Sequence, residues 1–431
     1  MKKLYPYQSE ALDRLYPHRY VGGALFMEPG LGKTITGIQW WEQQGTEKLI
    51  VVCPVSALGV WQNELTEAGY YVNLLSSTAA KKVKEIGHYS IVLINYEGLL
   101  NRDVLTALRK MGDYSLILDE SQRIKTPTAK RTKAALALSA DRPTLLLSGT
   151  PITRNYLDLY SQFRAIAPTI WDNISFTRFK QKYAVMGGYG GYEVVGWKNL
   201  ADMEKRIAPY TVSLHKADVL SLPPQTDQLV PVRMTPGQWK QYKDLANGGL
   251  WRDEPVPNAL VRALRLHQLI GVFKIDTTIE QVELLLDAGQ QVVVFYKYRE
   301  ESDKLRWAFA HTAEHLHGGV PALERAAQVS RFQRGESQVF LAQIDAGAVA
   351  ITLTASSNVV YHNMSWSYEA AAQSRDRVYR IGQRFPVTYR YVRMVGPEIQ
   401  NTIDDLIALA LKQKEDFAAM ITKNPTALEV T

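Results

Sequence analysis

A glycine-rich turn between two regular segments constrains the fold of this chain most strongly. The turn consists of Gly30, Leu31, Gly32, Lys33 and Thr34. It follows an apolar segment of strand character, 23–27, and opens a helical segment, 34–41. Backbone N–H groups of such a loop hold phosphate oxygens at the positive end of a helix dipole. The pattern predicts that Lys33 reaches the β and γ phosphates of a nucleotide and that the Thr34 hydroxyl binds Mg²⁺. Met27 stands where the strict pattern has glycine, so an ordinary glycine turn stays open as the alternative.

Apolar segments of strand length recur in the first and last thirds of the 431 residues. They are 23–27, 49–53, 91–94, 116–118, 144–147, 292–296, 338–342, 358–361 and 389–392. Continuous apolar strands separated by helical stretches indicate parallel sheets that are covered on both faces. The sequence therefore predicts an α/β fold with two lobes, each a parallel sheet flanked by helices.

The middle of the chain has a different character. A helical elaboration is expected at about 155–220, and within it the glycine-rich stretch 187–192 predicts a flexible loop or hairpin tip. Leu222-Pro223-Pro224-Gln225 cannot continue a helix and is typical of a linker. We therefore expect an N-terminal lobe at 1–228 and a C-terminal lobe at 229–431, ending in a helix from Thr402 to Phe417.

Composition excludes several classes of protein. A hydrophobic fraction of 46% excludes disorder as the dominant state. The single cysteine, Cys53, excludes a disulfide framework and a cysteine-rich zinc module. Without a signal peptide or a long apolar run, we expect a cytoplasmic protein with no membrane contact and no structural zinc. Fifty Lys and Arg against 43 Asp and Glu give a net charge of +7, which permits a nucleic-acid partner.

Two adjacent carboxylates, Asp119 and Glu120, follow the apolar segment 116–118. Alone, this pattern is also that of an exposed acidic strand end. Together with the upstream phosphate loop, it predicts a hydrolytic site. Asp119 would hold Mg²⁺, partly through water, while Glu120 would orient and deprotonate the attacking water.

Three motifs resemble those of the SWI/SNF-type ATPases of superfamily-two helicases. Asp119-Glu120-Ser121-Gln122 resembles motif II and Ser148-Gly149-Thr150-Pro151 resembles motif III. The segment 373–383, Gln-Ser-Arg-Asp-Arg-Val-Tyr-Arg-Ile-Gly-Gln, closely resembles motif VI. The resemblance covers most of the chain and suggests a minimal bacterial or phage form. It implies two tandem RecA-like lobes with a helical insertion between them, and a helicase-like ATP hydrolase that uses ATP and Mg²⁺.

The resemblance also implies roles for individual residues around ATP. Gln8 would read the adenine, and Gln373 would contribute to nucleotide binding. Ser148, Gly149 and Thr150 would couple hydrolysis to motion. Arg377 and Arg380 would be arginine fingers that stabilise charge on the transferred phosphoryl group. Their spacing places both guanidinium groups on one face of the helix expected there.

Contacts to the DNA backbone follow from three further motifs. By resemblance, Pro54 and Ser56 belong to motif Ia, Asn95 and Tyr96 to motif Ib, and Gly347 and Thr352 to motif V. Such contacts position a protein on DNA without reading its sequence. Motif V departs from the family pattern, because Asp345 stands where a basic or hydroxyl residue is common. An acid at that position would weaken a phosphate contact.

Three functions are compatible with these features. The first is an ATP-driven translocase on double-stranded DNA, acting as a monomer. The second is a strand-separating or annealing helicase at forked DNA, since Gly196-Trp197-Lys198-Asn199-Leu200 resembles the annealing-helicase branch. The third is a switch whose nucleotide state controls an unidentified protein partner.

Overall fold

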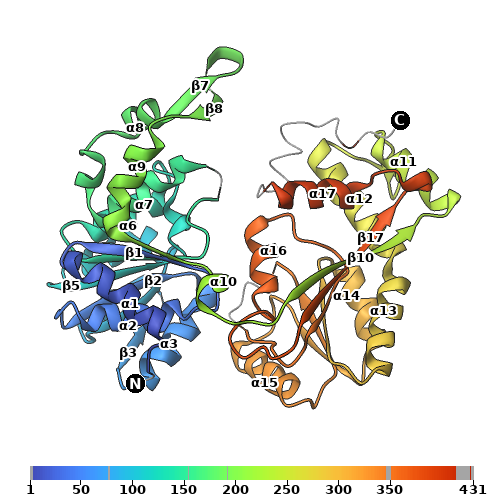
Figure 1. The fold of residues 1–431 in the computed structure, drawn as a ribbon, viewed down its shortest axis with the longest axis horizontal. Helices are drawn as coiled ribbons and strands as arrows, with labels where there is room; N and C mark the ends of the chain where they lie inside the picture. Colours follow the sequence, from blue (N-terminus) through green and yellow to red (C-terminus); the bar gives the residue numbers. More distant parts are fainter. Residues whose placement is uncertain are drawn as a thin grey trace. The chain divides into compact units, whose positions relative to one another are not determined.

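The chain divides into two compact units, seen in Figure 1. The computed structural model describes residues 3–75, 78–153, 155–191, 193–345, 351–413 and 428. Met1–Leu220 form the first unit and Ser221–Thr431 the second, here called lobe 1 and lobe 2. The expected boundary at 228 falls within strand β10, Gln225–Arg233, which belongs to the sheet of lobe 2. Among the described residues, no helix is both long and apolar enough to cross a membrane.

Lobe 1 is built on a parallel sheet. Within the described residues its seven strands lie in the order β3-β4-β2-β5-β6-β1-β9. The strands are β1 (Gly22–Met27), β2 (Lys48–Cys53), β3 (Val72–Leu74), β4 (Ile91–Asn95), β5 (Tyr114–Asp119), β6 (Thr144–Ser148) and β9 (Thr211–Leu214). The five apolar segments expected as strands in this part of the chain are confirmed, whereas β3 and β9 were not predicted.

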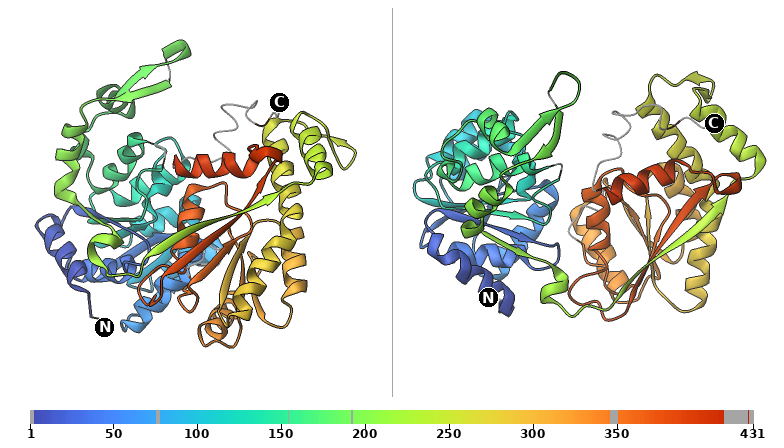
Figure 2. Two further views of the ribbon diagram at one scale, coloured as in Figure 1. Left: turned by 45° about the vertical axis from the view of Figure 1, so that its right-hand side comes forward. Right: turned by 45° about the horizontal axis from the view of Figure 1, so that its top comes forward.

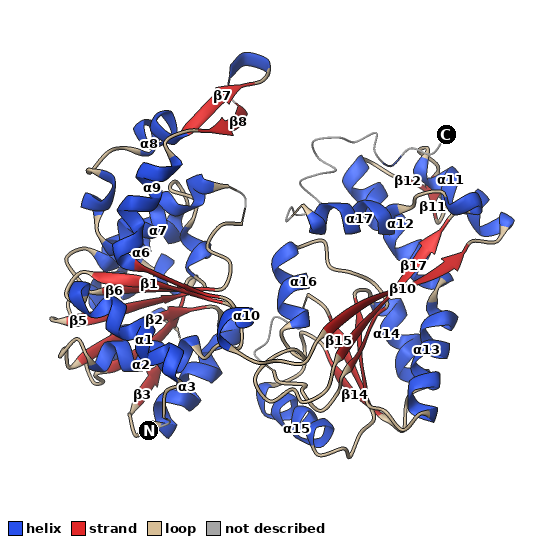
Figure 3. Cartoon of the chain, viewed as in Figure 1, coloured by secondary structure: helices blue, strands red, loops and turns tan. Residues whose placement is uncertain are grey.

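Helices cover both faces of the lobe 1 sheet, as Figure 3 shows. The helices are α1 (Pro6–Leu15), α2 (Lys33–Glu42), α3 (Leu58–Glu67), α4 (Ala79–Ile86), α5 (Arg102–Arg109), α6 (Lys130–Ser139), α7 (Leu159–Ile166), α8 (Phe176–Tyr183), α9 (Leu200–Ile207) and α10 (Lys216–Val219). Successive strand residues alternate between two cores: Leu25 packs with α1, α2 and α3, and Phe26 packs with α5, α6 and α7. Strands buried on both faces explain the unbroken apolar runs.

The expected elaboration of lobe 1 contains a hairpin as well as helices. Strands β7 (Ala184–Gly187) and β8 (Glu193–Trp197) pair antiparallel, and the glycine-rich stretch forms their connection. Figure 1 shows the hairpin extending away from the lobe 1 sheet beyond α8. At its base the Trp197 ring packs edge-on against Tyr156, with ring centroids 5.1 Å apart.

Lobe 2 repeats the parallel architecture. Within the described residues, six strands lie in the order β10-β17-β16-β13-β15-β14. Apart from β10, they are β13 (Val292–Tyr296), β14 (Ala313–Leu316), β15 (Val339–Gln343), β16 (Asn358–Tyr361) and β17 (Val387–Val395). The four strands expected in this part of the chain are confirmed. The expected linker leads straight into β10. Strand β10 was not predicted because most of its residues are polar and exposed, and the four-residue strand β14 was not predicted either.

Buried side chains of lobe 2 form two cores on the sheet and a third beside it. Helices flank the lobe 2 sheet (Figure 2). They are α11 (Pro236–Ala246), α12 (Ala259–Phe273), α13 (Ile275–Asp287), α14 (Arg299–Ala308), α15 (Ala322–Gln333), α16 (Tyr368–Arg375) and α17 (Ile403–Lys412). A small hairpin joins β11 (Leu250–Trp251) to β12 (Glu254–Pro255). The helix expected at 402–417 is present as α17, and residues 414–417 lie outside the described part.

Candidate active site

The glycine-rich turn lies between β1 and α2, as expected for a phosphate loop. Gly30 and Gly32 have φ angles of 89° and 80°, a conformation that favours glycine. A Cβ atom on Gly32 would lie 2.3 Å from Nε2 of Gln8, so this position also requires glycine for space. The first turn of α2 carries no acidic residue, which leaves its positive dipole end available to an anion.

Side chains from α1 and α2 hold this loop in place. Gln8 is buried, and its Nε2 donates a hydrogen bond to the Leu31 carbonyl at 2.8 Å. Nζ of Lys33 donates to the Met27 carbonyl at 2.8 Å, which keeps the ammonium group over the loop. Thr34 follows in the first turn of α2 and is half-buried. The residues predicted to bind a nucleotide in lobe 1 therefore gather around one turn.

The paired carboxylates stand at the carboxyl end of β5. Asp119 is 8% exposed, and its Oδ2 accepts a hydrogen bond from the Trp61 indole at 2.9 Å. Burial and the charge of Glu120 raise the pKa of Asp119 to about 6, while the Trp61 hydrogen bond and the charge of Lys33 oppose that rise. Carboxylate and hydroxyl oxygens are hard ligands of the kind that Mg²⁺ prefers, so Asp119 and Thr34 fit the metal proposed for them.

Glu120 has a strained backbone and a fixed side chain. Its φ of 50° is uncommon for a residue other than glycine and marks a conformation that the surrounding structure must maintain. Oε2 of Glu120 accepts a hydrogen bond from the Gln122 side-chain amide at 2.8 Å. The carboxylate is therefore aimed by its neighbour rather than left to rotate.

A chain of hydrogen bonds connects Glu120 to the end of the neighbouring strand β6. Oε1 of Gln122 accepts from the Ser148 hydroxyl at 2.7 Å, and the Ser148 Oγ accepts from the Thr150 backbone N–H at 3.0 Å. Gly149 approaches the phosphate loop, since a Cβ there would lie 2.9 Å from Cδ of Pro29. Ser148 and Thr150 are thus connected to Glu120 through Gln122, and Gly149 between them lies close to the phosphate loop.

Three residues of this site were not assigned a role from the sequence. Gln122 joins Glu120 to Ser148, Trp61 fixes Asp119, and Glu28 accepts the Lys216 backbone N–H at 2.9 Å, which links the phosphate loop to α10. Gln122 lies within the motif II segment, so its position was the one available signal. The contacts of Trp61 and Glu28 depend on tertiary packing that no local pattern records.

The motif VI residues of lobe 2 lie partly on α16 and partly beyond it. Gln373 lies on α16, where its Nε2 donates to Oε1 of Glu369 at 3.2 Å. The prediction that Arg377 and Arg380 share a helix face is wrong, because α16 ends at Arg375 and both arginines follow in turns. Tertiary pairing holds these turns: the Arg377 carbonyl accepts the Leu353 N–H at 2.8 Å.

The two arginines differ in exposure. Arg377 is buried, with 8% of its surface exposed. Arg380 is half-buried, and one of its guanidinium nitrogens donates to the Ile351 carbonyl at 3.4 Å. Burial lowers the pKa of Arg380 from its ordinary value. Because the pKa of an arginine lies far above neutral pH, Arg380 remains charged, and its guanidinium group can stabilise an anion.

The residues of motifs Ia and Ib that are predicted to contact DNA lie at or after the ends of β2 and β4, and the prediction for Tyr96 needs a correction. Tyr96 is fully buried, and its hydroxyl donates to the Asp119 carbonyl at 2.7 Å, so its side chain supports the active site rather than meeting a phosphate. Asn95 caps the turn after β4, where its Oδ1 accepts the Gly98 N–H at 3.2 Å. Pro54 is buried, Ser56 and Thr352 are half-buried, and Gly347 lies outside the described residues.

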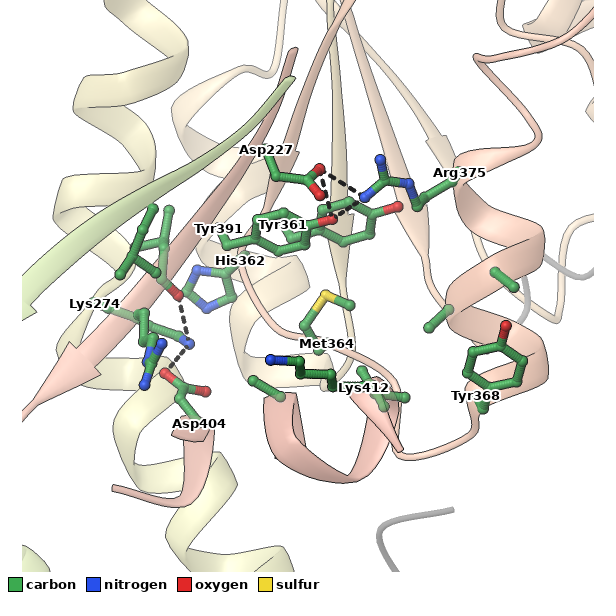
Figure 4. A pocket seen from close by; sticks show the side chains of 17 residues that line it. Asp227, Lys274, Tyr361, His362, Met364, Tyr368, Arg375, Tyr391, Asp404 and Lys412 are labelled. Atoms are coloured by element: carbon green, nitrogen blue, oxygen red, sulfur yellow. Dashed lines mark hydrogen bonds and ion pairs between the residues drawn. The ribbon is translucent and has the colours of Figure 1, made fainter. Parts of the chain in front are cut away.

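A separate cavity of about 460 Å³ lies within lobe 2, on the side of β17 next to α16 and α17. Figure 4 shows Tyr361, Tyr391 and Met364 among its walls. Ion pairs stand at opposite sides: Arg375 with Asp227 at 2.7 Å, and Lys274 with Asp404 at 2.7 Å. This cavity contains none of the residues predicted for catalysis, and we assign it no part in the reaction.

A parallel sheet with a phosphate loop at one strand end and paired carboxylates at a nearby strand end defines a nucleotide hydrolase of the P-loop class. Comparison with protein families sharpens this class. The SNF2-related domain matches residues 7–280, and the helicase conserved C-terminal domain matches residues 274–382. The chain belongs to the SNF2-related family of helicase-like ATPases.

Individual relatives are distant in sequence. YwqA of Bacillus subtilis (strain 168), named for an ATP-dependent helicase or translocase, is 24% identical over 98% of this chain and 49% of its own length. DNA annealing helicase and endonuclease ZRANB3 of Mus musculus is 26% identical over 96% of this chain and 40% of its own length. The chain thus spans less than half of the length of these relatives.

A solved structure is equally distant in sequence and aligns with most of the chain. The SWI2/SNF2 ATPase core of Sulfolobus solfataricus in complex with double-stranded DNA is 23% identical. The alignment covers 99% of this chain and 94% of that chain, with a TM-score of 0.47.

Proposed function

We propose that this protein is an ATP-dependent translocase on double-stranded DNA. The observation that carries the proposal is the hydrogen-bond chain from Glu120 through Gln122 and Ser148 to Thr150. This hydrogen-bond chain connects Glu120, the group that would activate water, to the carboxyl end of β6. A movement of that strand end would therefore change the position of Glu120. A simple hydrolase has no need of such a connection, whereas a motor must couple chemistry to movement.

In the proposed reaction, Glu120 accepts a proton from water as the water oxygen forms a bond to the γ-phosphorus of ATP. The bond from the γ-phosphorus to the bridging oxygen breaks, and ADP leaves with the bonding electron pair. Lys33 stabilises charge on the β and γ oxygens, and Arg377 and Arg380 stabilise charge that develops on the transferred phosphoryl group. Mg²⁺, when bound by Thr34 and by Asp119 partly through water, neutralises phosphate charge.

DNA is proposed as the partner on two grounds. Family relatives are named as DNA enzymes, among them a DNA annealing helicase and a DNA excision repair protein. The net charge of +7 suits a polyanionic partner. Asn95 ends β4 and Ser56 lies three residues after β2, and both residues and Thr352 are partly accessible, as a contact to phosphate oxygens requires.

An annealing or strand-separating helicase is the second candidate. It is favoured by the hairpin of β7 and β8, whose base includes Gly196 and Trp197, two residues of the segment that resembles the annealing-helicase branch. Val195 on that hairpin is 60% exposed and presents an apolar side chain of the kind that inserts between base steps. A fluorophore–quencher assay of duplex opening and reannealing distinguishes this candidate from a translocase.

ATP hydrolysis measured side by side with duplex DNA, single-stranded DNA, forked DNA and RNA tests the proposal. We expect duplex DNA to stimulate the rate most, and Glu120→Gln to remove the stimulated rate while retaining nucleotide binding. Equal stimulation by duplex and single strands, or stimulation by RNA alone, would reject duplex translocation. Stimulation by forks alone would favour the helicase candidate.

A further inference from the structure

Three neighbouring strands of lobe 2 bring a lysine, an aspartate and a serine together at their carboxyl ends. Lys297 follows β13, Asp345 follows β15, and Ser365 follows β16. These strands are adjacent in the sheet, in the order β16-β13-β15. Backbone hydrogen bonds continue beyond the strands, since Ile344 N–H donates to the Tyr296 carbonyl at 2.8 Å. The three loops are therefore held in a fixed relation.

Lys297 and Asp345 form an ion pair at this junction. The Ser365 hydroxyl is buried and donates to the other oxygen of Asp345 at 2.6 Å. The exposures of the two charged side chains differ: 12% of the Lys297 side chain is accessible, against 44% for Asp345. The carboxylate is thus the more accessible partner of this ion pair, and the lysine side chain is mostly buried.

A cation so enclosed requires an anion beside it. Aromatic rings take up two other directions, with Nζ of Lys297 5.9 Å from the Tyr298 ring and 5.8 Å from the Trp366 ring. Rings attract a cation but do not neutralise it. Removing the carboxylate would leave a partly desolvated charge, which is costly unless another anion replaces it. The site is therefore one that accepts an oxyanion in the place of Asp345.

We propose that Lys297 is a binding residue for a DNA phosphodiester, and that Asp345 is a built-in competitor for the same ammonium group. The inference rests on the proposed function, because the ligand is the DNA on which the motor moves. Ligands of open parallel sheets bind at the carboxyl ends of the strands, which is where this pair stands. Lysine is a compact point charge that suits a phosphate oxygen.

The competitor explains why motif V departs from the family pattern at position 345. An acid there lowers the affinity for phosphate without abolishing it, because the exposed carboxylate can be displaced from Lys297. A motor that does not read sequence must release phosphates at every step, and each additional tight contact would slow that release. Asp345 would therefore limit the affinity of lobe 2 for the DNA phosphate backbone.

The salt dependence of DNA binding tests this assignment directly. The full chain and its Asp345→Asn variant are titrated with a fluorescent duplex by anisotropy over a series of KCl concentrations. Each phosphate neutralised contributes about 0.9 to the slope of log K against log salt. We expect Asp345→Asn to steepen the slope by about 0.9 and to tighten binding about fivefold at low salt. Adding Lys297→Met to Asp345→Asn should restore the original slope.

Asp287→Asn is the matched control. It makes the same change in net charge at an exposed aspartate on the last turn of α13, before the opposite end of β13. The control should leave the slope as it is. A thermal unfolding curve for each variant establishes that the fold is retained.

Several results would overturn the inference. An unchanged slope in Asp345→Asn would show that this carboxylate does not compete with DNA phosphate for Lys297. An equal increase in Asp287→Asn would show a general charge effect. A change in ATP affinity as large as the change in DNA affinity would assign the nucleotide phosphates to Lys297 instead. Binding of duplex by the unmodified chain with no effect of Asp345→Asn removes this inference alone. Absence of duplex binding in every variant removes the proposed function as well.

Discussion

The carboxyl ends of the strands in the two lobes use the same architecture in opposite ways. In lobe 1 the backbone forms the site: Gly30 and Gly32 adopt positive φ angles, and Gly149 approaches Pro29 closely. In lobe 2 side-chain charges fill the equivalent edge, beginning with Lys297 and Asp345. A parallel sheet thus determines only where a binding site can form. Glycines or charged side chains at that edge determine whether the site binds a nucleotide.

Buried ionisable groups extend the contrast in lobe 2. Glu301 is 2% exposed, and it accepts the backbone N–H groups of Lys297 and Tyr298 at 2.9 and 3.0 Å. Burial raises the pKa of Glu301 to about 7. His267 and His362 are fully buried, and burial lowers the pKa of each well below its usual value. Lobe 2 therefore holds the loop after β13 with a buried carboxyl group, whereas in lobe 1 the neutral amide of Gln8 and the Lys33 ammonium group hold the phosphate loop.

The largest expected effect comes from Arg380, near the end of motif VI in lobe 2. We expect Arg380→Ala to lower ATP turnover about 1,000-fold while nucleotide binding persists, because an arginine on the transferred phosphoryl group stabilises the transition state. Steady-state hydrolysis and binding of a fluorescent ATP analogue measure the two quantities. Arg384→Ala, at an exposed arginine nearby, is the control. Normal turnover in Arg380→Ala would exclude Arg380 from the reaction and leave Arg377 as the candidate arginine of lobe 2.

A smaller effect concerns the buried acid of lobe 2. Between its unfolded pKa near 4.5 and its native pKa of about 7, Glu301 holds a proton in the folded state that the unfolded chain releases. The unfolding free energy of the parent protein therefore falls by up to about 3 kcal/mol as pH rises through that window, because the folded state disfavours the ionised form of Glu301. The side chain at position 301 does not ionise in the Glu301→Gln variant, so the variant should gain stability relative to the parent as pH rises.

Melting temperatures of Glu301→Gln and its parent at about pH 5 and about pH 8 provide the measurement. The difference between the two proteins should shift in favour of the variant by about 5 °C or more at the higher pH. Both histidines are present in the variant and in the parent, so their contribution largely cancels. Glu283→Gln, at an exposed position on α13, is the control. A difference independent of pH would mean that Glu301 is ionised throughout.

The smallest effect tests the hydrogen-bond chain of lobe 1. Ser148→Ala removes the donor to Gln122, and loss of one buried hydrogen bond corresponds to about a tenfold change in rate. We expect the DNA-stimulated rate to fall about tenfold more than the rate without DNA. Ser213→Ala on β9, at an exposed site in the same sheet, is the control. An equal loss in both rates would show that Ser148 orients Glu120 without coupling.

Much of the fold could be predicted because both sheets consist of buried strands. Continuous apolar segments marked nine of the strands, from β1 to β17, and the glycine pattern marked the loop before α2. Strand β10 was not predicted because it is a polar, exposed edge strand, and β3, β9 and β14 were not predicted because they have only three or four residues.

The candidate site was predictable in its residues but not in all of its contacts. Lys33, Asp119 and Glu120 belong to local motifs, so spacing alone locates them. The positions of Arg377 and Arg380 beyond α16 depend on pairing with residues near Leu353, which lies far from them in the sequence. Burial of Tyr96 under Asp119 is likewise a tertiary fact. Local patterns locate functional groups, and packing decides which of them meet.

Displacement of the third strand from a DNA triplex tests the central claim most directly. A motor moving along the duplex removes a third strand in its way and leaves the duplex paired. We predict ATP-dependent displacement by the full chain, no displacement by Glu120→Gln, and no opening of the underlying duplex in a fluorophore–quencher assay. Failure to displace the third strand while duplex DNA stimulates ATP hydrolysis would contradict translocation.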